Sequence, residues 1–300
     1  MATLGERRAI ASPALARILV LGAVWGTSFL FIRVADRGFS PAQVVQGRLV
    51  FGALALGLFM VAGHRRLPRQ RRLVGHLVVM GVVANVVPFL LIAWGETRVS
   101  SSLAAVLNAS TPIMTVLLAL LVLPAERPTP LRAAGIAAGL GGVVLVMHPW
   151  SRGATTGSLV GELACVGAAL CYGVTFVYTR RFISPLGAEP VGMAAAQIGS
   201  GAVMLGLLAP ALERSGVHAH WTAWLSLVAL GAVNTGVAYV WYFQLTRATG
   251  AAASSMVTYV SPVVAVVLGA AVLGESLGWE LFVGGAVVLA GVAMAQTGRS

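Results

Sequence analysis

The sequence predicts an all-α integral membrane protein with ten transmembrane helices, arranged as two inverted five-helix repeats around a central cavity. Three observations support this fold class. The chain of 300 residues is 58% hydrophobic and 10% charged, with a mean hydropathy of +0.89. It contains ten apolar runs of membrane-spanning length, and the second five match the first five in order. A soluble globular protein of this composition would expose far too much apolar surface to water.

Each predicted span is an apolar run of about 20 residues bounded by Arg, Pro, Gly or acidic residues. The ranges are 15–34, 41–62, 73–95, 99–123, 130–147, 159–180, 189–211, 221–245, 250–274 and 278–297. Because little chain remains between them, we expect no soluble domain. The first run follows Arg7, Arg8 and Arg17 and has no small-residue cleavage site, so we interpret it as a retained helix.

The arginines between the spans predict the orientation of the chain. All twenty basic residues are Arg. With the N-terminus in the cytoplasm, fourteen fall on the cytoplasmic side and five outside, while Arg48 lies within the second span. This excess predicts a multi-pass protein of the cell inner membrane with both termini cytoplasmic. The same distribution accounts for the net charge of +11, so lipid rather than nucleic acid is the expected partner.

A repeat of about 150 residues organises the sequence. At an offset of 150, Gly81 meets Gly231 and Pro112 meets Pro262, among other identities, and further identities continue at an offset of 149. Each half has five spans, an odd number, so the second half must enter the membrane from the opposite side. This arrangement is an inverted repeat, which is characteristic of secondary transporters.

The fourth and ninth spans carry matching polar stripes. The run from Val99 to Leu123 is long enough to cross a bilayer as one helix, yet small and polar residues recur along it at spacings of three and four. Those residues are Ser101, Ala104, Asn108, Thr111 and Thr115, and the second copy has Ala251, Ser254, Thr258, Ser261 and Ala265. We expect the two helices to form two walls of one cavity.

Two further pairs of spans, the first with the sixth and the third with the eighth, present equivalent stripes at matching offsets. The predicted substrate-binding residues from all three pairs are Trp25, Ser28, Asn85, Phe89, Asn108, Thr111, Tyr172, Thr175, Thr235, Tyr239, Tyr242, Ser254, Thr258 and Ser261. They supply hydroxyl, amide and aromatic groups without formal charge, which suits a neutral or zwitterionic solute with an apolar side chain. For each single Ser or Thr, helix–helix hydrogen bonding is the alternative role.

Arg48 is the most conspicuous charge within a predicted span, and two roles are open for it. It either attracts a substrate carboxylate or serves as a structural strut that binds helix-end carbonyls. We favour the strut, because the repeat-equivalent position holds Gln197, which retains hydrogen bonding and lacks the charge.

The acidic residues bear on energetics. All nine carboxylates fall in loops or near predicted helix ends. Because proton-driven carriers usually need a titratable group within the membrane, we expect a facilitator or exchanger. Glu126 and Glu275 follow the two striped helices, where we expect them to cap a helix or hold a loop amide. No metal, cofactor or disulfide framework is predicted, and Cys165 and Cys171 are interpreted as small buried hydrophobic residues.

Glycines in the fifth and tenth spans predict close helix contacts. They are Gly135, Gly139, Gly142, Gly284, Gly285 and Gly291. Small faces of this kind pack helices within one chain or between two copies. We favour packing within the chain, and therefore a monomer.

A series of short motifs runs through both halves in a fixed order. They are Trp25–Phe29 (WGTSF), Arg48, Asn108–Pro112, Glu126, Tyr259–Pro262 and Gly274–Glu275. In this order they resemble the EamA family of the drug/metabolite transporter superfamily, over nearly all of the chain. The resemblance implies two EamA-type five-helix repeats, at 15–147 and 159–297, forming a basket around a cavity that moves small metabolites, often outward. Within the family, the chain is most similar to bacterial amino-acid exporters, including the aromatic amino-acid type.

The predicted function is therefore secondary transport, by export or facilitation, of small metabolites such as amino acids through alternating access. One alternative, efflux of drugs or cationic compounds, would be helped by a mid-membrane acid that the chain lacks. Another alternative, sugar-phosphate or nucleotide-sugar exchange, would want several cationic groups at the cavity, and only Arg48 qualifies. The sequence has no HExxH, no GxSxG and no close acid pair within a span, so we do not expect an enzyme.

Overall fold

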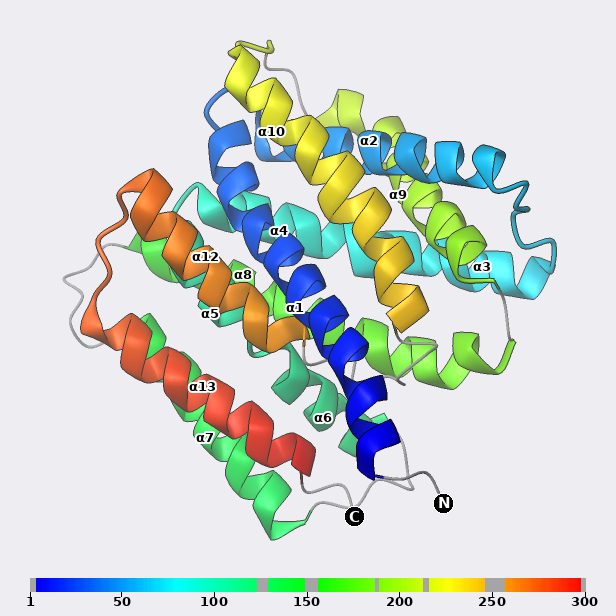
Figure 1. The fold of residues 1–300 in the computed structure, drawn as a ribbon. Helices are drawn as coiled ribbons and strands as arrows, with labels where there is room; N and C mark the ends of the chain where they lie inside the picture. The colour runs from blue at the N-terminus through cyan, green and yellow to red at the C-terminus, as the bar shows by residue number, and fades with distance from the viewer. Residues whose placement is uncertain are drawn as a thin grey trace.

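The computed structural model describes residues 4–122, 129–148, 156–186, 189–212, 216–245 and 257–297. Within these ranges every regular element is helical (Figure 1). Eight helices are long and apolar enough to cross a membrane, and they coincide with the first eight predicted spans. Two shorter apolar helices, Val257–Leu273 and Trp279–Ala295, lie within the last two predicted ranges. Residues 250–256, which belong to the ninth range, lie outside the described residues.

The first half contains five spans in order. They are α1 (Leu4–Ala35), α2 (Pro41–Ala62), the third span made of α3 (Arg71–Met80), the π-helix η1 (Gly81–Val86) and α4 (Val87–Glu96), then α5 (Ser101–Asn108) with α6 (Thr111–Val122), and α7 (Pro130–Met147). Their starts follow from local sequence. At α2, the Ser40 hydroxyl accepts from the Gln43 amide at 3.3 Å, and the Gln43 side chain accepts from the Ser40 amide at 3.0 Å. Pro41 then fits the first helical position, where no donor is needed.

The second half follows a similar order. It contains α8 (Thr156–Tyr178) with the short η3 (Thr179–Ile183) and η4 (Ser184–Leu186), then α9 (Pro190–Leu212), α10 (Trp221–Gly231) with the π-helix η5 (Ala232–Val237), α12 (Val257–Leu273) and α13 (Trp279–Thr297). The apolar span that starts with α10 continues through η5 to Leu245.

Two π-helical segments occupy corresponding places in the halves. η1 begins at Gly81 and η5 at Ala232, and each lies between two α-helical stretches of an apolar span. In the first copy, Pro88 has no amide hydrogen and cannot complete the preceding turn, which favours the wider turn there. In the second copy, Ala238 stands in that place. Single π-turns of this kind often occur at functional sites.

The fourth span, predicted at 99–123, is present, but its helix is interrupted in the middle. α5 ends at Asn108, and a turn at Ala109 and Ser110 separates it from α6. Pro112 cannot donate to a carbonyl one turn earlier, so the chain frees backbone acceptors at this point. The hydroxyls compensate: Ser110 donates to the Leu107 carbonyl and Thr111 to the Asn108 carbonyl, each at 2.7 Å. Irregular backbone at membrane depth is tolerated where such groups or a cavity satisfy it.

The helices pack in an order that differs from their order in the sequence. α1 contacts α12 and α10, α2 contacts α9 and η5, and α4 and α6 both contact α8. α7 and α13 lie side by side as a pair at one edge of the bundle (Figure 1). The start of α1 and the end of α13 lie at the same end.

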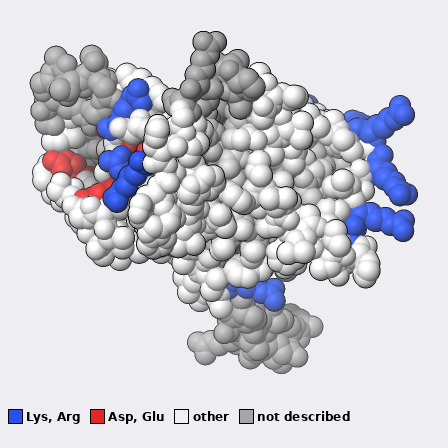
Figure 2. All heavy atoms as spheres, turned by 90° about the horizontal axis from the view of Figure 1, so that it is seen from above, with Lys and Arg blue, Asp and Glu red and all other residues white. Residues whose placement is uncertain are grey.

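Charge is distributed unevenly over the ends of the bundle. On the face shown in Figure 2, basic side chains project from the edge where Figure 1 places the connection between α2 and α3, and no acidic side chain is visible beside them. That connection and the start of α3 carry exposed arginines, namely Arg65, Arg66, Arg69, Arg71 and Arg72. At the opposite edge, basic and acidic side chains lie together.

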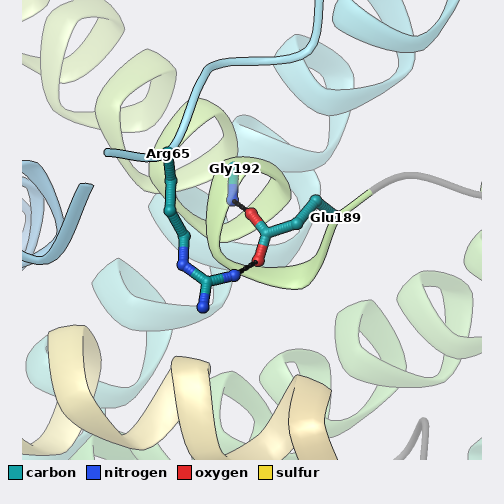
Figure 3. Close-up of polar contacts among 3 residues, drawn as sticks. All are labelled: Arg65, Glu189 and Gly192. Atoms are coloured by element: carbon teal, nitrogen blue, oxygen red, sulfur yellow. Dashed lines mark hydrogen bonds and ion pairs between the residues drawn. The ribbon is translucent and has the colours of Figure 1, made fainter. Parts of the chain in front are cut away.

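One ion pair ties this arginine-rich connection to the second half. The Arg65 guanidinium donates to Oε1 of Glu189 at 2.5 Å, and the Gly192 amide donates to Oε2 of the same carboxylate at 2.9 Å (Figure 3). Glu189 therefore caps the start of α9 while holding the loop after α2. Because both side chains are partly exposed, with 47% and 38% of their surface accessible, this pair stabilises the fold by at most about 1 kcal/mol.

Candidate functional site

A cavity of about 260 Å³ lies within the helical bundle, and both halves of the chain line it. This volume is slightly below the range of roughly 300–1,000 Å³ that is typical of small-molecule sites. Most of its wall is aromatic or aliphatic, with a few hydroxyl and amide groups and two arginines. The cavity can therefore hold one small solute with a substantial apolar part.

Most of the residues selected from the sequence line this cavity. Those that do are Trp25, Arg48, Phe89, Asn108, Thr111, Tyr172, Thr175, Tyr239, Tyr242, Thr258 and Ser261. Three others lie outside the lining: Ser28, Asn85 and Thr235 are 6%, 0% and 0% exposed and hydrogen-bond to other protein groups. Ser254 lies outside the described residues.

The aromatic wall is centred on Trp25. Its ring lies 5.3 Å from that of Tyr242 and 6.3 Å from that of Tyr239, measured between centroids. Tyr239 in turn meets Phe243 edge to face at 6.2 Å. The Trp25 indole nitrogen donates to the backbone carbonyl of Asn234 at 3.1 Å, which fixes the ring against the cavity. Such rings provide contact area for an apolar side chain at little entropic cost.

Asn234, in η5, connects this wall to α1. Its side chain is 0% exposed, and its amide nitrogen donates to Thr27 Oγ1 at 2.8 Å, to Ser28 Oγ at 3.0 Å and to the Val24 carbonyl. These contacts span more than 200 residues of sequence. Asn234 therefore positions Trp25 and explains why Ser28 is engaged away from the cavity.

A second chain of polar side chains supports the same aromatic wall at Tyr239. Gln197, which lines the cavity, donates to Asn85 Oδ1 at 2.8 Å, and Asn85 donates to the Tyr239 hydroxyl at 2.8 Å. Asn85 thus holds Tyr239 from behind rather than facing the solute. This arrangement satisfies two buried amides and orients one aromatic ring.

Arg48 extends from α2 into the same space. Its Nε donates to Thr235 Oγ1 at 2.9 Å, and its guanidinium carbon lies 3.7 Å from the centroid of the Phe89 ring. The side chain is 6% exposed and lines the cavity. These contacts place a cation between an aromatic face and a hydroxyl, where a planar guanidinium is well suited.

Several site residues were not selected from the sequence. Phe29, Phe176, Phe243 and Arg180 line the cavity, and Asn234 supports it. Gln197 was recognised only as the counterpart of Arg48. A buried amide in an apolar span is itself a signal because it must find partners, and this signal would have identified Asn234.

Two carboxylates near predicted helix ends are fully buried. Glu96, in the last turn of α4, and Glu162, in α8, are both 0% exposed. The backbone carbonyl of Glu96 accepts from Arg33, whereas neither of its carboxylate oxygens has a hydrogen-bond partner among the described residues. Asp36 follows the end of α1, and burial raises its pKa to about 7 although nearby Arg33 acts to lower it. In the described part of the chain, no three His, Cys, Asp or Glu side chains form a metal site.

Glu275 caps a helix of the other half. Its Oε1 accepts from the Ser101 amide and hydroxyl, each at 2.8 Å, and its Oε2 accepts from those of Ser102 at 3.1 and 2.5 Å. Partial burial acts to raise the pKa of Glu275, but these four hydrogen bonds lower it below its ordinary value. The carboxylate therefore joins the loop after α12 to the start of α5. Glu126, its predicted counterpart, lies outside the described residues.

Glu275→Ala is expected to lower stability by about 1–2 kcal/mol at neutral pH, because two α5 amides lose their acceptor. The depressed pKa means that the folded state favours the ionised carboxylate. This stabilisation is present above the unfolded-state pKa and is lost as the pH falls through the lower folded-state pKa. Thermal unfolding in detergent should show a difference between wild type and variant at about pH 7 that shrinks below about pH 4. A difference independent of pH would contradict the role of the charge.

Apolar membrane-length helices around a small internal cavity define a multi-pass membrane protein with a solute-sized site. The model of the EamA-like transporter family matches residues 13–148 and again 159–297, and the chain belongs to this family. As a member of a transporter family, it is a membrane transport protein.

Named relatives extend over nearly the whole chain. A "Probable terminal-alkyne amino-acid exporter" of Streptantibioticus cattleyicolor is 32% identical over 91% of this chain and 90% of its own length. "Uncharacterized transporter YdfC" of Bacillus subtilis is 28% identical, with 91% and 87% covered, and "Uncharacterized inner membrane transporter YedA" of Escherichia coli is 26% identical, with 88% and 84% covered. A crystal structure of another protein is similar in fold, with a TM-score of 0.69 and 22% identity over 95% of this chain and 96% of that one.

Proposed function

We propose that the protein is a secondary transporter that moves small metabolites, amino acids including aromatic ones, across the inner membrane by alternating access. The observation that supports this proposal most is the internal cavity, whose wall combines aromatic rings with a few hydroxyl and amide groups. The relative named as an amino-acid exporter supports the substrate class, and the relative named as an inner membrane transporter supports the location.

The proposed mechanism uses two inverted halves of five spans, 15–147 and 159–297, that rock about the cavity with both termini in the cytoplasm. The matching π-helices η1 and η5 and the break between α5 and α6 are places where the helices can bend. Arginines crowd the end that carries the α2–α3 connection, which supports a cytoplasmic location for that end. The protein acts as a monomeric facilitator or exchanger that follows the gradient of its solute.

The substrate class is tested by counterflow in proteoliposomes loaded with a panel of amino acids, nucleosides and cationic drugs. Amino acids should exchange, and saturation with concentration should distinguish a carrier from a channel. Exchange of cationic drugs alone would contradict the proposal. The same vesicles, given a pH gradient and no solute gradient, test the energetics, since concentrative uptake would show proton coupling.

Trp25→Ala and Asn108→Leu are expected to lower flux per inserted molecule by about ten-fold, because each removes a group that lines the cavity. Trp241→Ala is the matched control for the tryptophan, since Trp241 is 44% exposed and does not line the cavity. Flux and membrane insertion are measured together by transport and by quantification in the vesicles. Unchanged flux in both cavity variants would show that the cavity is not the transport route.

A further inference from the structure

Arg48 is a buried cation, and no carboxylate in the described part of the chain forms an ion pair with it. It is 6% exposed, and the ion pairs seen among the described residues, such as that of Arg65 with Glu189, do not include it. Removing a guanidinium from water is unfavourable unless an opposite charge or hydrogen bonds compensate. The two contacts that Arg48 makes are with neutral groups, the Thr235 hydroxyl and the Phe89 ring. The Glu96 carboxylate acts on its charge only from beyond ion-pair distance.

These contacts also fix the direction of the guanidinium. The Thr235 hydroxyl donates its proton to the Leu230 carbonyl at 3.0 Å, so it is the acceptor for Arg48 Nε. The Phe89 ring covers one face of the planar group at 3.7 Å. The two terminal nitrogens make no hydrogen bond to any described residue, and Arg48 lines the cavity. The edge with two parallel N–H donors is therefore free for a molecule in the cavity.

A free guanidinium edge matches the two oxygens of one carboxylate, which it binds through two parallel hydrogen bonds. Asn108 offers a complementary acceptor, because its Oδ1 is buried at the cavity wall without a partner among the described residues. A protonated amine would satisfy such an oxygen. The rest of the cavity wall is largely aromatic or aliphatic, which fits an apolar side chain and not a hydrated dianion such as phosphate.

We propose that Arg48 binds the carboxylate of the transported solute and that the protein selects solutes that carry one. This inference rests on the proposed function and narrows its substrate class. The sequence favoured a structural role for Arg48. The free terminal nitrogens favour the carboxylate site instead, because in a structural role they would donate to helix carbonyls. The strut and the carboxylate site predict different responses to the same set of probes.

The test uses four aromatic probes that differ only in their polar groups: L-phenylalanine, L-phenylalaninamide, 3-phenylpropionate and phenethylamine. Binding to the purified full chain is measured by calorimetry in detergent, and counterflow is measured separately in proteoliposomes. The two acids should bind at least about ten-fold more tightly than the amide and the amine. Chloride and inorganic phosphate, each added alone, should compete poorly with 3-phenylpropionate.

Equal binding of the acid and the amide would overturn the proposal, and so would failure of both acids to bind. Competition by chloride or phosphate as strong as that of the organic acid would also overturn it in favour of a general anion site. Transport without discrimination between acid and amide would contradict the carboxylate site and leave the transport function standing. Binding of acids without flux would contradict the transport function and leave the carboxylate site standing.

Variants add a second line of evidence. Arg48→Gln should weaken binding of both acids at least about ten-fold and leave the weak binding of the amide unchanged. Arg48→Lys keeps the positive charge but lacks the two parallel N–H donors. It should therefore retain part of the preference for acids that Arg48→Gln loses. Thr235→Val keeps the guanidinium and removes its orienting acceptor, so a smaller loss is expected. If Arg48→Gln does not fold, the wild-type probe comparison and Thr235→Val still decide between the two roles.

Discussion

Gly142→Ala is expected to destabilise the protein, whereas Gly141→Ala, one residue earlier on α7, is expected to leave it unchanged or stabilise it. A Cβ at Gly142 would lie 2.7 Å from the backbone nitrogen of Val288 and 2.9 Å from the carbonyl oxygen of Gly284, both on α13. A Cβ at Gly141 would meet no heavy atom within 4 Å. The contact at Gly142 involves backbone, so the two helices must separate to accept a methyl group.

The two substitutions are matched in every other respect. Each adds one methyl group and raises helix propensity by about 1 kcal/mol. Overpacking at Gly142 should cost about 1–3 kcal/mol beyond that gain, because α7 and α13 are held by close backbone packing along their length. The measurements are thermal unfolding in detergent and the yield of folded protein in the membrane. Equal effects of the two substitutions would contradict the packing.

The α7–α13 contact also explains the predicted glycine faces. Gly135 and Gly142 face the backbone of α13, and Gly285 faces Val106 of α5. The contacts predicted from small residues therefore form within one chain. A stripe of small residues in an apolar span can be predicted to be a helix contact from the sequence, because small side chains allow two helix backbones to approach closely.

Other features could be predicted because they follow from the lipid environment or from the repeat. Span positions follow from the length of apolar runs, since lipid requires satisfied backbone groups over about 20 residues. Part of the cavity wall could be predicted from the repeat, because equivalent positions of the two halves are expected to face one cavity. Trp25 and Tyr172 occupy equivalent positions, and both line it. The break at Ala109 could not be read from hydropathy, because it depends on which hydroxyls replace the lost helical bonds.

The prediction for Thr235 illustrates a limit of helical periodicity. An offset of 150 aligned Asn85 with Thr235, whereas the π-helices that contain them begin 151 residues apart. A π-turn has more residues per turn than an α-helix. Residues spaced three or four apart therefore no longer lie on one face of the helix at that point. In η5, Asn234 donates to α1 and Thr235 accepts from Arg48, so neither side chain lines the cavity.

Asn234→Leu is expected to destabilise the protein and to reduce transport together. Leucine keeps the size of the side chain but removes the donor that serves the Val24 carbonyl and the Thr27 and Ser28 hydroxyls. Hydrogen bonds between membrane helices contribute about 0.6–2 kcal/mol each, so a loss of about 1–3 kcal/mol is expected. Flux should fall because loss of the side-chain bonds to α1 lets the η5 backbone shift, and the backbone carbonyl of residue 234 holds the indole of Trp25.

A double-mutant cycle with Ser28→Ala separates the hydrogen bond from general disruption. Because Ser28 and Asn234 share one bond at 3.0 Å, the double variant should be less destabilised than the sum of the single variants. Val233→Ala is the neighbouring control, since Val233 is 44% exposed on the outside of the same π-helix. Unfolding in detergent gives the energies, and counterflow per inserted molecule gives the transport effect. Strict additivity, or full flux in Asn234→Leu, would show that η5 does not position the aromatic wall through α1.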